Sequence, residues 1–221
     1  SPVSAVLSAL VIKAWFYILL RLWIMLFGPF AGDDVATLLG FLGAAAILWG
    51  SIQALRQTRL KLLVAYSTVA QIGYLFLAFP LATLAAWNGA AMLVLSHALA
   101  KSAMFLAAGN LLNFGGHDRI ADLDRIVQRL PLSAFAFALA GVSLTALPPS
   151  GGFIGKWLLL EAALAQDRWD LVAVMLLGGL LAAAYVFKVL GKSFTQADVA
   201  YTYQPKAIPA RMEWVAVILA C

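Results

Sequence analysis

The sequence has very little charge. Lys, Arg, Asp and Glu make up 11% of its 221 residues, whereas hydrophobic residues make up 64%. Soluble domains carry about 25% charged and about 45–50% apolar residues. This composition excludes a soluble globular domain, a disordered tail and a nucleic-acid-binding protein. It indicates a polypeptide whose solvent is the lipid bilayer, and we therefore expect an integral membrane protein.

Cysteine and the motifs of cofactor chemistry are also scarce. The single cysteine, Cys221, excludes an intrachain disulfide and a thiolate-rich metal site. The sequence contains no GxGxxG fingerprint, phosphate-binding loop, CxxC or HExxH motif. We therefore predict no catalytic, cofactor-binding or metal-binding residues, and we expect the chain to bind no cofactor itself.

What the sequence does have is long hydrophobic runs. A helix needs about 20 apolar residues to cross the hydrocarbon core. Alternating strand patterns are absent, so the backbone must be satisfied within helices. We predict an all-α polytopic helical bundle with six full transmembrane helices and part of a seventh, which begins near Glu213. The six stretches are Ser4–Phe27, Val35–Leu55, Leu60–Pro80, Ala86–Leu112, Leu132–Ala165 and Leu171–Gly191.

The links between these stretches alternate in charge. Three links are rich in cations, and the links between them are poor in cations. The positive-inside rule places the cationic links in the cytoplasm, with the N-terminal residue inside and Cys221 heading outward. Both ends of the sequence cut into the pattern, so we expect residues 1–221 to be one transmembrane domain that is incomplete at both ends. The cationic links carry Arg56, Arg59, Lys61; Arg119, Arg125, Arg129; and Lys188, Lys192, Lys206, Arg211.

The fifth stretch is too long for one straight crossing and is interrupted at its middle. Pro148 and Pro149 remove backbone donors, and Gly151 and Gly152 tolerate unusual dihedral angles. We predict a helix over 132–147, an unwound segment, and a second helix over 153–165. Broken helices are a recurring feature of ion and substrate sites in transporters. The alternative is a tight loop between two short helices that do not fully cross.

Three lysines and one histidine lie within the apolar stretches. Lys13 and Lys101 are in the middle of their spans, and Lys156 directly follows the break. His97 lies four residues before Lys101, so both share a helix face. Charges at membrane depth are costly and must face a cavity or a partner. Because burial brings lysine into a range where it can gain and lose a proton, these residues are candidates for a proton relay.

Each candidate also has a purely structural interpretation. A lysine can pair with a carboxylate, and His97 can be an interior histidine bonded to a neighbouring helix. Glu161 is the one acidic residue available in the middle of a full span, and it is a possible secondary site. It lies about 140° of helix from Lys156 and could instead lie near the outer interface. The polar residues of the third stretch are interpreted here as contacts between helices.

These residues together resemble a known family. The stretches SPVSAVLSALVIKAWFYILLR, LKLLVAYSTVAQIGYLFLA, SHALAKSAMFLAAGNLL and LTALPPSGGFIGKWLLLEAAL are similar to the antiporter-like membrane subunits shared by proton-pumping NADH:quinone oxidoreductase (complex I, chains L, M and N) and Mrp-type Na⁺/H⁺ antiporters. The resemblance implies about fourteen helices in two inverted repeats, each with one broken helix. This chain resembles the eighth helix through the start of the fourteenth.

The resemblance also implies roles for single residues. Lys13 matches the connecting lysine of the eighth helix, His97 and Lys101 match the polar positions of the eleventh, and Lys156 matches the ionisable residue of the twelfth. It implies a bacterial inner-membrane location and partners that are other membrane subunits of a larger complex. The transported ion is the proton, with Na⁺ as a further candidate. The complex I, Mrp and membrane-bound hydrogenase branches are not separated by these stretches.

The expected function is therefore proton translocation by a midplane Lys and His relay. The chain has no active site of its own that the sequence reveals, so any enzymatic activity belongs to the complex. Two rivals remain open at this point. One is a structural membrane subunit that conducts no ions, and the other is an unrelated secondary transporter with a substrate site at the broken helix.

Overall fold

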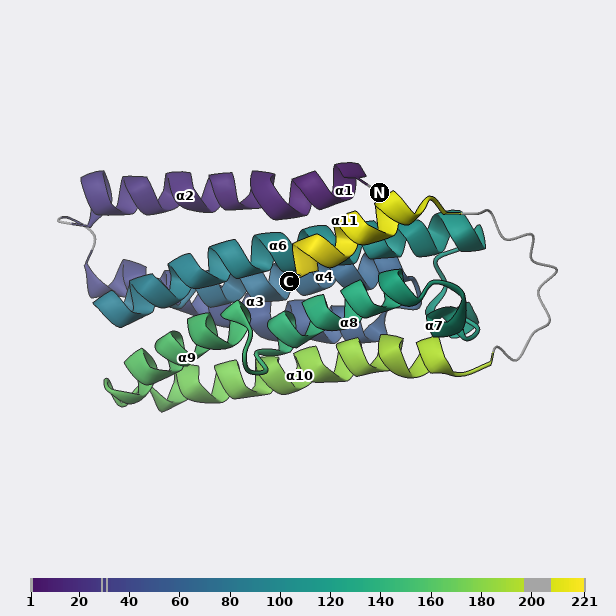
Figure 1. Ribbon diagram of the computed structural model, residues 1–221. Helices are drawn as coiled ribbons and strands as arrows, with labels where there is room; N and C mark the ends of the chain where they lie inside the picture. Colours follow the sequence, from purple (N-terminus) through teal and green to yellow (C-terminus); the bar gives the residue numbers. More distant parts are fainter. Residues whose placement is uncertain (1, 29, 31, 197–207, 221) are drawn as a thin grey trace.

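The computed structural model describes residues 2–28, 30, 32–196 and 208–220. Every regular element in this part of the chain is helical (Figure 1), as the composition predicts. Five helical segments are long and apolar enough to cross a membrane: Pro2–Phe27, Asp33–Arg56, Leu60–Leu81, Leu84–Gly115 and Trp169–Phe194. The molecule is a polytopic helical membrane protein. Lys206 and Cys221, which enter the expected topology, lie outside the described residues.

The first spanning segment is not a uniform α-helix. It runs through α1 (Pro2–Val6) and α2 (Ile12–Leu22), and each of these is followed by a wider turn, at Leu7–Val11 and at Trp23–Phe27. Within the wider turns the N–H groups bond five residues back, as from Gly28 to the Trp23 carbonyl at 2.6 Å. Such π-type turns redirect side chains and are frequent near functional groups.

The next two spans pack closely against each other through glycines. Helix α3 (Asp33–Arg56) lies on α4 (Leu60–Phe76), which α5 (Ala78–Leu81) extends. A Cβ atom added at Gly43 would lie 2.7 Å from the carbonyl oxygen of Gly73, so only glycine permits this approach. The contact fixes α4, whose buried face lines the centre of the bundle.

Helix α6 (Leu84–Gly115) is the longest element and begins and ends with local caps. The hydroxyl of Thr83 accepts a hydrogen bond from the N–H of Ala86, which satisfies one of the free donors of the first turn. Gly116 ends the helix in the left-handed conformation. Helices α4, α8, α9 and α11 all pack against α6, which makes it the central element.

The fifth hydrophobic stretch forms two short helices, α8 (Pro131–Thr145) and α9 (Gly151–Leu164), which follow each other along the bundle (Figure 1). Ala146 adopts a left-handed conformation and ends α8, and the Ser150 hydroxyl caps α9 by accepting from Phe153 N–H. The stretch is interrupted where the prolines predict it, which fits both one broken crossing and two short helices, and the limits of the interruption differ from the prediction. Gly151 and Gly152 lie in the first turn of α9 rather than in the unwound segment, because Ser150 starts the helix there.

The remaining helices are α10 (Trp169–Phe194) and α11 (Ala210–Ala220). Two small elements, the 3₁₀ turn Ile120–Asp122 and α7 (Ile126–Arg129), precede α8. Helix α11 packs on α6 and α8, and α10 packs on α3 and α8.

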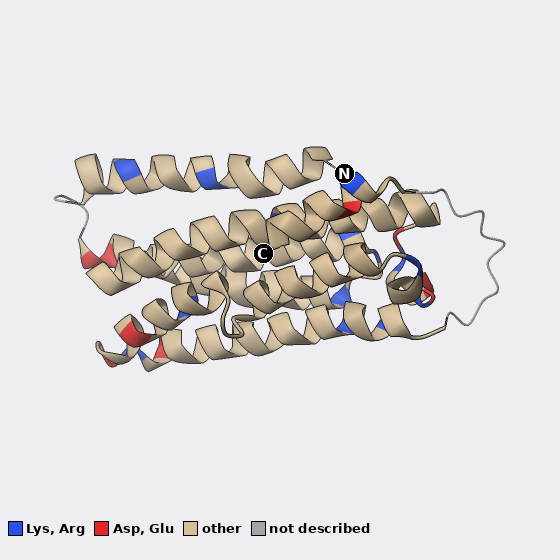
Figure 2. Cartoon of the chain, viewed as in Figure 1, with Lys and Arg blue, Asp and Glu red and all other residues tan. Residues whose placement is uncertain are grey.

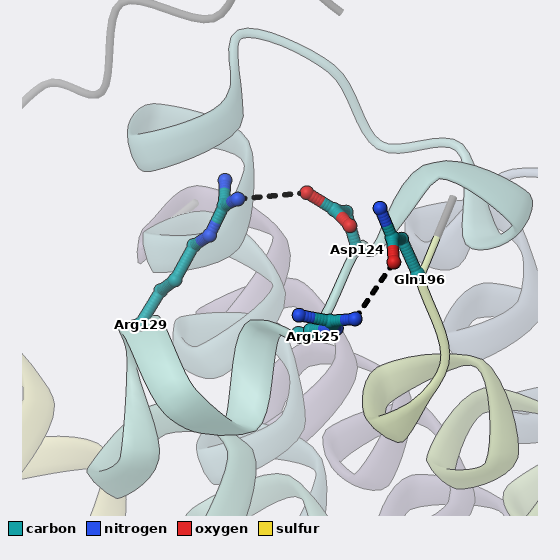
Figure 3. A network of polar contacts seen from close by, with 4 residues as sticks. All are labelled: Asp124, Arg125, Arg129 and Gln196. Atoms are coloured by element: carbon teal, nitrogen blue, oxygen red, sulfur yellow. Dashed lines mark hydrogen bonds and ion pairs between the residues drawn. The ribbon is translucent and has the colours of Figure 1, made fainter. Parts of the chain in front are cut away.

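The cationic links meet at one end of the bundle. Leu60 N–H bonds to the Asp118 carbonyl at 2.7 Å, and Lys188 Nζ donates to the carbonyls of Leu55 and Gln57. Figure 3 shows the Arg129–Asp124 ion pair beside the hydrogen bond from Arg125 to Gln196, which joins this end to the end of α10. Acidic residues lie at both ends of the bundle, beside the cationic links and at the opposite end (Figure 2). Only the cations of the described links are concentrated at one end.

Candidate functional site

Four titratable side chains of the bundle interior are buried, and they come from three separate elements. Lys13 of α2 is 6% exposed, Lys101 of α6 is 0% exposed, and Lys156 of α9 is 8% exposed. His97, one turn before Lys101 on α6, is 4% exposed. In the described part of the chain, the ion pairs join other residues, near the ends of the bundle, and none involves these lysines. The buried cations are therefore stabilised by dipoles rather than by carboxylates.

Hydrogen bonds of three residues lie between Lys13 and Lys101, but they do not form one continuous chain, because Lys13 bonds to the Ser8 carbonyl and Thr68 to the Ser8 hydroxyl. Lys13 donates to the carbonyl oxygen of Ser8, which lies in the first wide turn of its helix. The Ser8 hydroxyl is 2.9 Å from the Thr68 hydroxyl, and Thr68 donates to the Val64 carbonyl at 3.1 Å. Lys101 donates to that same Val64 carbonyl at 3.0 Å. Three residues, Ser8, Thr68 and Val64, thus lie between two lysines from different helices.

Lys156 is held by a carbonyl that the helix break exposes. At the end of α8, Leu147 and Ala146 N–H groups bond to the carbonyls of Val142 and Ser143, which leaves the Leu144 carbonyl without a helical partner. Lys156 Nζ donates to the Leu144 carbonyl at 2.7 Å, and Gln71 Nε2 donates to it at 3.2 Å. The break therefore supplies the acceptor that makes a buried lysine tolerable at this depth.

An aromatic ring completes the surroundings of Lys156. Its Nζ lies 4.3 Å from the centre of the Tyr74 ring, a cation–π distance. The Tyr74 hydroxyl points elsewhere and donates to the Met175 carbonyl of α10 at 3.0 Å. The ring face is thus available to the ammonium group, and α4 contributes to the lysine site from Gln71 and from Tyr74.

Helix α4 also lies between the surroundings of Lys101 and those of Lys156. Ser67 accepts a hydrogen bond from Lys101 and donates to the Val64 carbonyl. The fully buried Tyr185 of α10 lies next to the side chains of both Ser67 and Gln71. A polar path therefore runs from Lys13 to Lys156 along one face of α4, past Lys101.

His97 lies one turn before Lys101 on α6, and the charges of Lys13, Lys101 and Lys156 act on it. Neither of its ring nitrogens has a hydrogen-bond partner among the described residues. A buried polar group without a protein partner costs about 1–3 kcal/mol. The alternative of an interior histidine bonded to a neighbouring helix therefore has no such bond among the described residues, and the relay role of His97 stays a prediction.

The interpretation of the polar residues of α4 as contacts between helices is confirmed: Thr68 bonds to Ser8, Ser67 to Lys101 of α6, and Gln71 to the Leu144 carbonyl of α8. Their position beside the lysines was not predicted. The spacing of these residues in the sequence indicates that they share one face of the helix. Val64, Ser67, Thr68 and Gln71 follow the i, i+3, i+4, i+7 pattern of one helix face, and a polar stripe at membrane depth needs polar partners.

Other predicted residues lie apart from the path. Glu161 is exposed on α9. Pro148 and Pro149 are exposed in the gap between α8 and α9. Within the described ranges, no group of three His, Cys, Asp or Glu side chains could hold a metal ion. Glu213, which the sequence analysis treated only as the start of a helix, is buried and bonded to Ser133.

A cavity of about 340 Å³ lies beside the break. Pro149, Ser150 and Gly151 line it together with Ser96 and Ser143, whose hydroxyl oxygens are 2.6 Å apart. Its other lining residues are apolar, and no charged side chain reaches it. The volume falls at the lower limit of small-molecule pockets.

Comparison with known proteins gives one family. The family model described as "NADH:quinone oxidoreductase/Mrp antiporter, TM" matches residues 1–182. NADH-quinone oxidoreductase subunit N of Desulforudis audaxviator is 38% identical over 197 residues, covering 88% of this chain and 39% of that protein. The chain spans about two fifths of that relative's length.

Solved structures agree with this assignment. A chain of the Mrp complex from Dietzia sp. superposes with a TM-score of 0.80 at 25% identity, covering 94% of this chain and 37% of that one. A chain of the archaeal membrane-bound sulfane sulfur reductase superposes with a TM-score of 0.84 at 25% identity, covering 99% of this chain and 45% of that one. These similar chains are parts of multi-subunit membrane complexes.

Proposed function

The chain belongs to the NADH:quinone oxidoreductase/Mrp antiporter family, and from this premise we propose that it forms a proton-translocating part of a membrane subunit, with Lys13, Lys101, His97 and Lys156 as the relay. The observation that carries the proposal is the polar path along α4. It joins three buried lysines without a carboxylate in any of their hydrogen bonds. Such lysines can change charge by gaining or losing one proton.

On this proposal a proton passes from Lys13 to Lys101 and then to Lys156. Ser8, Thr68 and Val64 form polar surroundings between the first pair. The carbonyls of Ser8 and Val64 only accept hydrogen bonds, so the proton itself would move through water and the hydroxyl groups. Ser67, Tyr185 and Gln71 lie between the second pair, and His97 can accept or donate a proton near all three lysines. Charge changes in a neighbouring subunit would drive the transfers, because a nearby charge changes the proton affinity of a buried lysine.

The break between α8 and α9 is part of the same proposal. Neither helix is long enough to cross alone, since 15 and 14 residues extend about 22 and 21 Å. We infer that α8 and α9 together form one crossing, so that the bundle has six full spans, and that α11 begins a seventh. The exposed Leu144 carbonyl then lies at membrane depth, where unwound backbone must be buried in protein or line a wet cavity.

The proposed complex is of the complex I or Mrp type, in the bacterial inner membrane, with other membrane subunits as partners. The chain is proposed to bind no cofactor, so any redox chemistry would belong to other subunits. The proton is the proposed ion, and Na⁺ is a second candidate through antiport. Glu161, exposed on α9, is not part of the proposed path.

The test is Lys156→Ala in the complete complex. We expect proton transport in vesicles to fall at least about tenfold, which corresponds to the loss of about 1.4 kcal/mol of stabilisation, while the complex still assembles. Lys188→Ala is the matched control, because Lys188 also donates to backbone carbonyls but lies in the cationic end of the bundle. Unchanged transport in Lys156→Ala, with Lys188→Ala also unchanged, would favour a structural subunit.

The cavity at the break favours a second candidate, a transporter with a small uncharged substrate. Its lining offers hydroxyl groups but no charge. Gly151→Val would fill part of this cavity, because a Cβ at Gly151 would already lie 3.2 Å from the Ser96 Cβ. If transport of a solute, and not of protons, were lost in this variant, the second candidate would replace the first.

A further inference from the structure

Glu213 of α11 is the one acidic side chain that is buried in the described part of the chain. Its Oε2 atom accepts hydrogen bonds from the backbone N–H and from the hydroxyl of Ser133, both at 3.0 Å. Asn110 of α6 donates to the Ser133 hydroxyl at 3.1 Å and to the Met212 carbonyl at 3.2 Å. The carboxylate is therefore fixed by two neighbouring helices and forms no ion pair with another described residue.

Ser133 is the third residue of α8, so this contact lies at the amino end of that helix. The N–H groups of a first turn have no helical acceptor, and the helix dipole places partial positive charge there. Pro131 has no N–H, and Ala134 N–H bonds to the Leu130 carbonyl at 3.0 Å. In this first turn, Glu213 accepts its backbone hydrogen bond from the Ser133 N–H.

The opposite end of α8 holds Lys156. The Leu144 carbonyl, one residue before the helix ends, accepts from Lys156 Nζ at 2.7 Å. The partial negative charge of a helix carboxyl end favours an ammonium group. A buried carboxylate and a buried ammonium therefore contact the two ends of one short helix, and each has the sign that the helix dipole prefers.

Both charges come from other elements, Glu213 from α11 and Lys156 from α9. Between them α8 is packed into the bundle interior, where Ala136, Phe137 and Ala140 are buried. A tightly packed helix moves as a unit rather than deforming locally. The position of the Leu144 carbonyl against Lys156 is therefore coupled to the contact between Glu213 and Ser133.

We propose that Glu213 is a positioning residue for proton transfer at Lys156 and that it acts through α8. The inference rests on the proposed function, because it concerns the same lysine. The negative charge of Glu213 holds the amino end of α8 and, by direct attraction through the low-dielectric interior, favours the protonated form of Lys156. In a variant without this charge, Lys156 releases its proton more readily and the contact between α11 and α8 weakens.

Glu213 and Lys156 have different charged and titratable neighbours. Glu213 faces Asn110 of α6 and Ser133 of α8, which do not titrate, and Arg211 on its own helix is exposed. Lys156 lies over the Tyr74 ring on α4, and its charge acts on His97 and Lys101 of α6. The charge of Lys13 on α2 acts on the same two residues, and Tyr185 of α10 lies next to Ser67 and Gln71. Glu213 is the acidic member of this set, and it does not touch the lysines.

The test compares Glu213→Gln with wild type in the complete complex. A glutamine oxygen can still accept from Ser133, so this variant removes the charge and keeps the contact. We expect the pH profile of proton transport to move to lower pH by about half to one unit, a three- to tenfold change on the steep side. Asp33→Asn is the matched control, because Asp33 is also in a first helical turn but is exposed.

A pH profile of Glu213→Gln that coincides with wild type would overturn the proposal. If this variant does not assemble, Ser133→Ala replaces it, since the backbone N–H still contacts Glu213. We expect a smaller shift in the same direction for Ser133→Ala, and no shift would likewise overturn the proposal. The Lys156→Ala experiment separates the proposed function from the role of Glu213. If Lys156→Ala abolishes transport while the pH profiles of Glu213→Gln and Ser133→Ala stay unshifted, only the role of Glu213 is contradicted.

Discussion

Cations occur in two regions of this molecule, and their surroundings differ. Towards the ends of the bundle two of them pair with acids: Arg129 is 2.8 Å from Asp124, and Arg168 is 2.8 Å from Asp170. The hydrogen bonds that Arg168 donates to the Asp170 carboxylate raise the pKa of Arg168. These side chains are partly exposed, so their charge is permanent and water screens their interactions.

The centre of the bundle has the opposite arrangement. Lys13, Lys101 and Lys156 are buried and donate to carbonyl and hydroxyl oxygens. An acceptor of this kind stabilises an ammonium group without fixing its charge, since a neutral amine can still donate to the same oxygen. The comparison teaches that the cations at the ends help to set the orientation of the helices in the membrane. The central lysines, in contrast, have surroundings in which they can release a proton.

The largest expected effect comes from removing the central lysine. Lys101→Met keeps the volume of this fully buried side chain, and the Val64 carbonyl still accepts from Ser67 and Thr68. We therefore expect the complex to assemble and its proton transport to fall at least about tenfold. Transport in reconstituted vesicles is the measurement, and Lys192→Met, an exposed lysine near the end of α10, is the control.

A smaller effect is expected from interrupting the hydrogen-bonded link. Thr68→Val removes the hydroxyl that contacts Ser8 and the Val64 carbonyl, but it preserves the shape of the side chain. Loss of one such contact is worth about 0.5–1.5 kcal/mol, so transport should fall about two- to tenfold. Ser193→Ala removes another buried hydroxyl that bonds within its own helix. Equal transport rates in both variants would show that the link is not used.

The smallest effect is expected at the end of the bundle. Asp124→Asn weakens a partly exposed ion pair with Arg129. Such pairs contribute about 0–1 kcal/mol, so the midpoint of thermal unfolding in detergent should change little. Transport should be unchanged. A large loss of transport here would mean that the exposed cations belong to the conduction path and would remove the contrast between the two regions.

The sequence was sufficient to predict the five long spanning helices and to identify the buried lysines. Long apolar runs determine helices in lipid, and the observed spans begin and end within three residues of the predicted limits for most stretches. The break was also predictable, because two prolines cannot continue a helix. Its limits were not, since they depend on the Ser150 cap and on the left-handed Ala146.

The contacts between helices were beyond the sequence analysis. The roles of Thr68 and Gln71 depend on which face of α4 meets α6 and α8, and that face is set by close packing at glycines such as Gly43 and Gly73. The contact between Glu213 and Ser133 joins residues 80 positions apart. No local pattern predicts a pairing at that separation.

The central claim is that the buried lysines change charge. Side-chain ¹⁵N NMR of lysine-labelled complex in lipid bilayers distinguishes an ammonium group from a neutral amine. Signals assigned with the Lys13, Lys101 and Lys156 variants should convert from the ammonium to the amine form as the pH is raised across the range in which the complex transports protons. If all three remain ammonium groups throughout, the lysines are structural and the relay is contradicted.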